Sequence, residues 1–203
     1  MHIAIIGAGN IGGTLARKWA ATGHQLTLGV RDPNKPEVQQ LLAELGAGAR
    51  ATGIADAVQG AEAVVFAVPG RSMADTVASI GDALDGKVVI DATNNVGGSV
   101  FNSVGTINSV APRAQVYRAF NTYGWENFAA PVFDGVAADL FYAGPDGDAR
   151  AVAEQLISDV GLRPVRLGGP DKVGLVDSIL PLWFTLSSEV GLGRHFAFKV
   201  LSS

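Results

Sequence analysis

The stretch that decides the fold is "HIAIIGAGNIGGTLARKWAATGHQLTLG", residues 2–29. It begins and ends with short apolar runs, HIAII and QLTLG, which are typical of buried strands. Between them Ile11, Leu15 and Trp19 recur four residues apart, which is helix spacing. Gly23 supplies a left-handed position suited to ending that helix. A strand, a helix and a second strand in about 30 residues indicate the βαβ unit of a parallel sheet.

The turn inside this unit reads "GAGNIG" and matches G-x-G-x-x-G, the dinucleotide-binding fingerprint. The match is weak alone, but here it follows a strand and opens a helix, which is the context that supports it. Gly7 permits the tight turn, Gly9 lets a pyrophosphate approach the main chain, and Gly12 lets the helix pack on the strand. The N–H groups at the helix start then face the phosphates. A glycine-rich turn without a ligand is the alternative.

The end of the second strand, "LGVRDP", predicts which dinucleotide binds. A carboxylate at this point binds the ribose hydroxyls of NAD, whereas a nearby arginine accommodates the 2′-phosphate of NADP. Val30 occupies the acidic position, and Arg31 and Lys35 offer positive charge. Asp32 precedes Pro33, which favours a turn over a ribose contact. The sequence therefore predicts NADP(H), with a solvated surface arginine as the alternative for Arg31.

Strands and helices keep alternating along the rest of the chain, which predicts one Rossmann-type domain spanning residues 1–203. We expect an α/β fold with a doubly wound, mostly parallel sheet and helices on both faces. The expected strands are 2–6, 25–29, 49–52, one within 61–69, 87–94, 114–120, 139–144 and 163–167. The expected helices are 10–22, 36–45, 54–60, 72–84, a short one before 112, and 148–161.

The C-terminal segment, residues 171–203, is too apolar to lie free in water. We expect it to be helical, with a break or kink at Pro181. It either caps the active-site side of the sheet or packs against a second subunit. A homodimer is therefore expected.

Composition excludes several classes of function. Of 203 residues, 48% are hydrophobic and 17% charged, so the chain is globular rather than disordered. The net charge is −4 and there is no basic stripe, which argues against nucleic acid as the main partner. The absence of cysteine excludes disulfides, Cys-based metal sites and thiol catalysis. No signal peptide and no apolar run of about 18 residues is evident, so we expect a cytoplasmic protein without a membrane partner.

Sheets of this type bind ligands at the carboxyl ends of their strands. Here those ends read Ala67-Val68-Pro69, Ala92-Thr93-Asn94 and Ala119-Phe120-Asn121-Thr122. Asn94 and Asn121 end apolar strands, so each either points into the crevice or caps a turn.

A reductase of carbonyl groups needs a proton donor near the carbonyl oxygen, and candidates are few. His195 is the only histidine that we expect near the site, and no tyrosine has a lysine four residues on. Lys172 and Lys199 are further candidates. The alternative is an acceptor that needs no protein acid. Flavins and deazaflavins take a hydride onto their own rings, so we expect no catalytic side chain.

Several segments together resemble the NADPH:coenzyme F-420 oxidoreductase family, and also the cytosolic reductase half of the six-transmembrane metalloreductases. They are the glycine-turn unit, "DATN", "RAFNTYGWENF", "DLFYAG" and the ending "FAFKVL". The resemblance covers nearly the whole chain and implies that NADP(H) is the cofactor. The residues that the resemblance and the strand ends together predict for the cofactor are Gly7, Gly9, Asn10, Ile11, Gly12, Arg31, Lys35, Ala67, Val68, Pro69, Asn94 and Ala119.

The resemblance also implies that the two reacting rings stack near Ala119 and Asn121. Trp125 either stacks on a ring or is a buried loop tryptophan. Asn121 stands where the archaeal F-420 enzymes tend to carry histidine, and Trp125 follows the metalloreductase pattern. FMN or FAD therefore stays an alternative acceptor. The interpretation that we favour is an NADPH-dependent oxidoreductase that exchanges hydride with a small-molecule redox partner, a deazaflavin or flavin, with F-420 preferred. The alternatives are a reductase of a small carbonyl or imine and a non-catalytic NADP-binding sensor.

Overall fold

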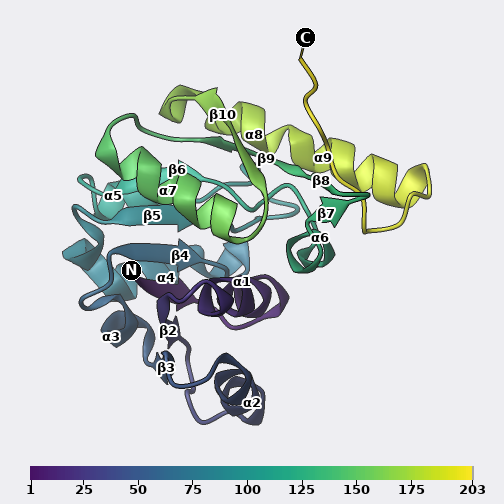
Figure 1. Ribbon diagram of the computed structural model, residues 1–203. Helices are drawn as coiled ribbons and strands as arrows, with labels where there is room; N and C mark the ends of the chain where they lie inside the picture. The colour runs from purple at the N-terminus through teal and green to yellow at the C-terminus, as the bar shows by residue number, and fades with distance from the viewer. Residues whose placement is uncertain (203) are drawn as a thin grey trace.

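Eight strands form one sheet in the computed structural model, which describes residues 1–202 (Figure 1). Their order is β10-β9-β6-β5-β4-β1-β2-β3. The strands are β1 His2–Ile6, β2 Gln25–Gly29, β3 Ala49–Thr52, β4 Ala63–Phe66, β5 Val88–Asp91, β6 Gln115–Arg118, β9 Asp139–Ala143 and β10 Arg163–Gly168. A separate two-stranded hairpin joins β7 Val132–Phe133 to β8 Val136–Ala137.

The six strands from β3 to β6 are all parallel, in the order 3-2-1-4-5-6 of a doubly wound dinucleotide-binding sheet. β9 runs antiparallel to β6, and β10 runs parallel to β9. The predicted fold class, a doubly wound and mostly parallel sheet, is confirmed.

Helices cover both faces of the sheet (Figure 1). The helices are α1 Asn10–Ala21, α2 Pro36–Leu45, α3 Ile54–Val58, α4 Met73–Ile80, α5 Val104–Val110, α6 Trp125–Ala129, α7 Asp148–Asp159, α8 Val173–Asp177 and α9 Ile179–Phe184. Ile3 and Ile5 of β1 face the core under α1, α2 and α7, whereas Ala4 and Ile6 face the core under α3, α4 and α5. Burial on both sides explains the unbroken apolar run of β1.

Two expected elements end three or more residues earlier than predicted, whereas the ends of the other strands and helices before the C-terminal segment agree within two residues. The helix expected over 72–84 stops at Ile80, because Gly81 adopts a positive φ of 66° and a 3-10 turn follows over Gly81–Leu84. The strand expected over 87–94 is β5 alone. The residues after it, from Ala92, leave the sheet and enter the site described below.

The expectation of a helical tail broken at Pro181 is wrong in two respects. The helix break falls at Ser178, between α8 and α9, and Pro181 lies in the first turn of α9. Proline is tolerated there because a first-turn N–H has no partner within the helix. Helical structure ends with a π-turn at Glu189, and Gly191 and Gly193 then adopt positive φ angles of 83° and 74°.

Residues 194–200 form a strap without regular secondary structure, which packs near the carboxyl ends of the parallel strands. The Phe198 N–H donates to the Tyr123 hydroxyl at 2.9 Å, and that hydroxyl donates to the Asp139 carbonyl at 2.7 Å. The buried Asp139 carboxylate accepts hydrogen bonds from Arg163, from Lys199 and from the Val200 N–H. Within residues 1–202, no helix is both long enough and apolar enough to span a bilayer.

Candidate functional site

The glycine turn between β1 and α1 is shaped by close main-chain contacts. Gly7 has a φ of 106°, and a Cβ there would lie 2.7 Å from the Ala67 carbonyl oxygen. A Cβ on Gly12 would lie 2.0 Å from the Gly7 carbonyl oxygen. Both positions therefore require glycine, for the tight turn and for the close packing of α1 on the strands.

Gly9 differs, because a Cβ there would meet nothing within 4 Å. Gly9 caps α1 without a side-chain hydrogen bond, and the first turn of α1 carries no acidic residue. Within residues 1–202, the N–H groups of Asn10, Ile11 and Gly12 donate to no acceptor. An open surface with unpaired N–H groups at a helix N-terminus fits the pyrophosphate of a dinucleotide.

The loop after β2 carries the predicted 2′-phosphate ligands on its surface. Arg31 and Lys35 are exposed, and neither side chain makes a hydrogen bond or ion pair within the described chain. The Asp32 carboxylate accepts the Asn34 N–H at 3.0 Å, so Asp32 begins a turn, as predicted. Val30 is 9% exposed and belongs to the core. The loop thus offers positive charge, and its Asp32 carboxylate is engaged within the turn, which fits NADP better than NAD.

The strand ends predicted to hold the nicotinamide lie beside the glycine turn. A Cβ on Gly7 would also lie 2.9 Å from Val68 Cγ1, so β4 and the turn meet at this point. Ala67 and Val68 are half-buried, Pro69 is exposed, and Ala119 is fully buried at the end of β6.

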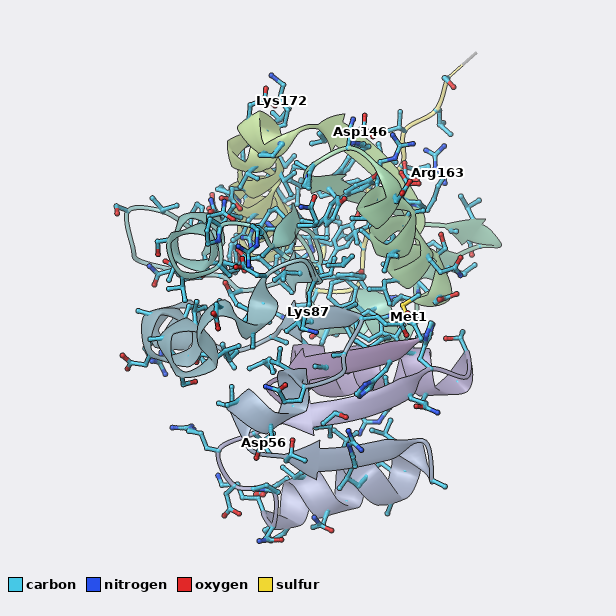
Figure 2. The ribbon with its side chains drawn as sticks, turned by 90° about the vertical axis from the view of Figure 1, so that its left-hand side faces the viewer. Met1, Asp56, Lys87, Asp146, Arg163 and Lys172 are labelled. Carbon is cyan, nitrogen blue, oxygen red and sulfur yellow. The ribbon has the colours of Figure 1, made fainter. Side chains whose placement is uncertain are left out.

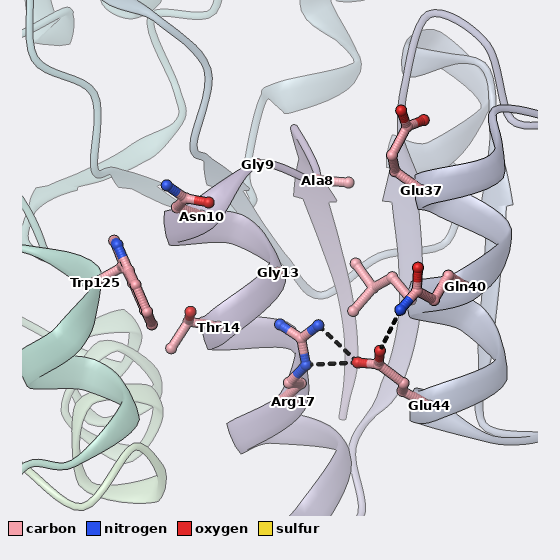
Figure 3. Close-up of a pocket in the computed structure, with 11 residues that line it drawn as sticks. Ala8, Gly9, Asn10, Gly13, Thr14, Arg17, Glu37, Gln40, Glu44 and Trp125 are labelled. Carbon is pink, nitrogen blue, oxygen red and sulfur yellow. Dashed lines mark hydrogen bonds and ion pairs between the residues drawn. The ribbon is translucent and has the colours of Figure 1, made fainter.

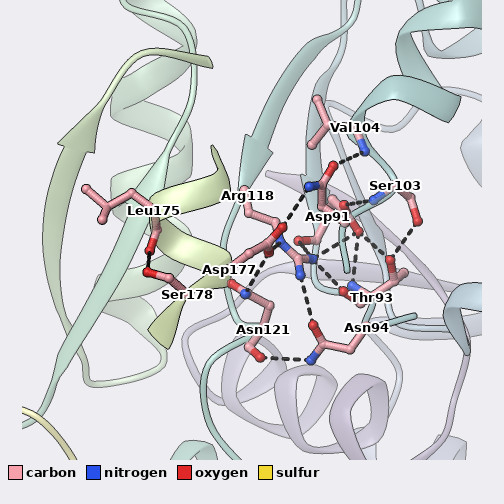
Figure 4. A network of polar contacts seen from close by, with 11 residues as sticks. Asp91, Thr93, Asn94, Ser103, Val104, Arg118, Asn121, Leu175, Asp177 and Ser178 are labelled. Atoms are coloured by element: carbon pink, nitrogen blue, oxygen red, sulfur yellow. Dashed lines mark hydrogen bonds and ion pairs between the residues drawn. The ribbon is translucent and has the colours of Figure 1, made fainter. Parts of the chain in front are cut away.

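A buried ionic network, which the sequence analysis missed, lies at the ends of β5 and β6 (Figure 4). Arg118 is 0% exposed, and its Nε donates to Asp177 Oδ1 of α8 at 2.7 Å. Its Nη1 lies 3.4 Å from Asp91 Oδ1 and donates to the main-chain carbonyls of Asp91 and Thr93. Asp91 also accepts the Ser103 N–H at 2.6 Å. The network thus joins two strand ends to α8.

The two asparagines singled out from the sequence belong to this network (Figure 4). Asn94 Oδ1 accepts a hydrogen bond from Arg118 at 2.8 Å, and its Nδ2 donates to the Asn121 carbonyl at 2.8 Å. Asn121 is 1% exposed, and its Nδ2 lies 3.4 Å from Asp177 Oδ1. The structure therefore brings Asn94 and Asn121 together.

A hollow of about 370 Å³ opens on the outer side of α1, between α2 and α6 (Figure 3). Its lining residues are Ala8, Gly9, Asn10, Gly13, Thr14, Arg17, Glu37, Gln40, Leu41, Glu44 and Trp125. Trp125, 39% exposed, faces this hollow rather than Asn121. The hollow reaches the glycine turn but includes none of Arg31, Val68 and Asn121, so Trp125 and Asn121 belong to different surroundings.

The candidate proton donors all have partners. His195 Nε2 lies 2.9 Å from the Ala130 carbonyl oxygen, and Lys199 donates to Asp139 at 3.0 Å. Lys172 lies on the surface at the start of α8, paired with Asp171 (Figure 2). Burial, opposed by a main-chain hydrogen bond, raises the pKa of Tyr123 well above its usual value.

Comparison with known proteins identifies the family. Residues 2–95 match the family model described as NADP oxidoreductase, coenzyme F-420-dependent. The F-420-dependent NADP reductase of Methanothermobacter thermautotrophicus is 30% identical, covering 92% of this chain and 89% of the relative. Its counterpart in Methanothermobacter marburgensis is 27% identical, with 92% of each chain covered.

A solved structure agrees over the whole length. The crystal structure of a candidate F-420-dependent NADP reductase from Arthrobacter sp. FB24 superimposes with a TM-score of 0.85 and 28% identity, covering 98% of this chain and 99% of that one. With the glycine turn and the order of the parallel strands, these similarities confirm the resemblance read from the sequence. The chain belongs to the coenzyme F-420-dependent NADP oxidoreductase family and is an NADP-dependent oxidoreductase.

Proposed function

We propose that this enzyme exchanges a hydride between NADP(H) and coenzyme F-420. Relatives that match nearly the whole chain are named F-420-dependent NADP reductases. The observation that carries the proposal is the chemistry of the carboxyl edge, the edge of the sheet where the carboxyl ends of the parallel strands lie. Its ionisable side chains Asp91, Arg118 and Asp177 are buried and bonded to one another. Such an edge orients a ring that accepts hydride itself, whereas a carbonyl needs a free proton donor.

Different residues of the chain bind different parts of NADP(H). The N–H groups that follow Gly9 hold the pyrophosphate at the start of α1. Arg31, assisted by Lys35, binds the 2′-phosphate through a planar and permanently charged fork. Ala67, Val68 and Pro69 flank the nicotinamide, with Asn94 and Ala119 on the neighbouring strand ends. The side chains of Ala67, Val68 and Pro69 are uncharged and apolar, so they limit the access of water to the reacting faces.

When bound, NADPH supplies one hydride, and a proton from solvent completes the reduced deazaflavin. The chain contributes by holding two flat rings face to face, since reacting atoms at contact distance account for much of the rate of such transfers. Asn121 orients the acceptor at the end of β6. Trp125 lines the outer hollow, which includes none of Ala67, Val68 and Pro69, so we assign it to the hollow and not to the ring stack.

The test is anaerobic hydride transfer from NADPH to oxidised F-420, following the absorbance of both chromophores. FMN and FAD are run in parallel. We expect rapid transfer to F-420 and little to the flavins. Transfer to a flavin alone would replace F-420 by that flavin as the acceptor. NADPH binding without transfer to any ring acceptor would refute the proposal, and reduction of imines or carbonyls would identify the alternative enzyme class.

The role of Arg31 is tested by Arg31→Ala. The variant loses charge-assisted hydrogen bonds worth about 1.5–3 kcal/mol, so NADPH should bind about 10- to 150-fold more weakly, with NADH little changed. Arg113→Ala is the matched control, because Arg113 is 79% exposed and pairs with Asp85 near the opposite, amino edge of the sheet. Equal losses of affinity for NADPH and NADH would show that Arg31 does not bind the 2′-phosphate.

A further inference from the structure

The turn that follows β6 concentrates polar groups without partners. Within residues 1–202, no acceptor receives a hydrogen bond from the five main-chain N–H groups of residues 120–124. The side-chain atoms Asn121 Oδ1 and Thr122 Oγ1 are also buried and unpaired. Phe120 and Asn121 are each 1% exposed, and Thr122 is 0% exposed. Buried polar groups in folded proteins are nearly always paired, so this cluster needs an explanation.

The neighbouring turn after β5 shows that the feature is local. There the Ala92 N–H donates to the Phe66 carbonyl at 3.1 Å, the Thr93 N–H to Asp91 Oδ1 at 3.0 Å, and the Asn95 N–H to the Phe101 carbonyl at 2.9 Å. Both turns lie at the same edge of the sheet. Of these two turns, the one after β6 is the one that leaves a row of main-chain donors unpaired.

The turn is also held in a strained conformation. Phe120 has a φ of 60°, which a bulky residue rarely adopts. Its ring packs edge-on against Trp19 at 5.9 Å and Phe128 at 5.5 Å, and these contacts fix it in the core. Strain that the surroundings maintain in this way is found at ligand-binding sites more than elsewhere.

The ionic network determines which atom Asn121 offers to a ligand. Its amide faces Asp177 Oδ1 at 3.4 Å, and a carboxylate only accepts hydrogen bonds, so the facing atom is Nδ2. Asp177 itself is held by Arg118 Nε and by Asn102 Nδ2, each at 2.7 Å. Asn121 therefore presents Oδ1, an acceptor, among the main-chain donors of the turn.

We propose that this turn recognises the pyrimidine edge of the acceptor ring, an inference that rests on the proposed function. That edge, shared by flavins and deazaflavins, presents a carbonyl, an N3–H and a second carbonyl. The main-chain N–H groups of the turn and Asn121 Oδ1 together offer the matching set, with donors for the carbonyls and an acceptor for the N3–H. The turn is closed to solvent, so the ring edge enters by displacing part of it, and its hydrogen bonds form out of water.

The decisive experiment perturbs both partners of the predicted hydrogen bond. The acceptors are the F-420 chromophore and its N3-methyl derivative, which lacks the N3–H. The proteins are the wild type, Asn121→Leu and the control Asn108→Leu, which places leucine on the exposed side of α5. For each pair we measure kcat/KM for the acceptor and, separately, the Kd of NADPH.

The wild type and Asn108→Leu should prefer the unmethylated ring by about tenfold, and Asn121→Leu should lose that preference while its Kd for NADPH stays within about twofold. Methylation changes the ligand alone, so the wild-type preference tests the hydrogen bond even where Asn121→Leu folds poorly. A wild type indifferent to methylation would overturn the inference. An Asn121→Leu variant that keeps the preference would also overturn it. A variant that loses affinity for NADPH instead would overturn it too, and that result would assign Asn121 Oδ1 to a contact with the nicotinamide carboxamide. A wild type that reduces neither ring would refute the proposed function itself, and the inference with it.

Discussion

Asp177→Asn tests whether the buried network supports the site. Arg118 is completely buried, and its closest carboxylate is that of Asp177, at 2.7 Å. Removing one charge of a buried ion pair typically costs about 3–5 kcal/mol. Asp91 remains 3.4 Å away, and carbonyl oxygens still accept hydrogen bonds from Arg118. We therefore expect the lower end of that range, a loss of about 3 kcal/mol of folding free energy.

The assay is urea unfolding, followed by tryptophan fluorescence. Glu44→Gln serves as the control, because Glu44 pairs with Arg17 on the surface at 2.6 Å with both side chains largely exposed. An exposed pair is worth about 1 kcal/mol or less. If Asp177→Asn lost no more stability than Glu44→Gln, the network would not stabilise the carboxyl edge.

The same variant has a second readout. Without the charge at position 177, the amide of Asn121 loses its orienting partner, so the KM for the acceptor should rise several-fold more than the Kd of NADPH. A parallel rise in both constants would indicate general loosening of the fold.

Three further outcomes are expected. Gly12→Ala forces α1 away from the glycine turn, because its Cβ would lie 2.0 Å from a carbonyl oxygen, and calorimetry should show NADPH affinity reduced at least about tenfold. Burial alone would raise the pKa of Asp139, but hydrogen bonds donated to it lower that pKa from 3.8 to about 2. Stability present above pH 4 is therefore lost as pH falls to 2, by about 2 kcal/mol, and denaturation across that range should show no such loss in Asp139→Asn. Exposed apolar side chains of residues 175–201 support the proposed homodimer, so light scattering should give twice the chain mass of 20.9 kDa, and a monomer mass would contradict it.

The first part of the fold could be predicted almost to the residue. β1, β2 and α2 begin and end where the sequence indicated, because apolar spacing, Pro36 and the glycine turn are local signals that agree with one another. The hairpin of β7 and β8 was missed, although Asp134 and Gly135 both adopt positive φ angles, as an Asp-Gly turn favours. Its strands are two residues long, too short for any periodicity to show.

The site was only partly predictable, for a physical reason. The glycines and the arginine predicted to bind the cofactor lie in or directly after one βαβ unit, so local sequence patterns are enough to predict them. The network at the acceptor end joins Arg118 to Asp177 across 59 residues, and no local pattern specifies that contact. One signal was present: Asp91 ends the apolar strand β5 and Arg118 ends the largely buried strand β6, and charges in such positions are seldom buried without a partner.

The strap and the network both contact the turn after β6, which is the proposed acceptor site. Tyr123 bonds to the strap through Phe198, and Asn121 bonds to α8 through Asp177, so the turn between them is held from both sides by C-terminal segments. The glycine turn, in contrast, is shaped by close contacts within the first βαβ unit and with Ala67 after β4. The first 35 residues therefore contain the local signals for NADP(H) binding, whereas the proposed acceptor site depends on distant contacts such as those of Asp177 and Phe198.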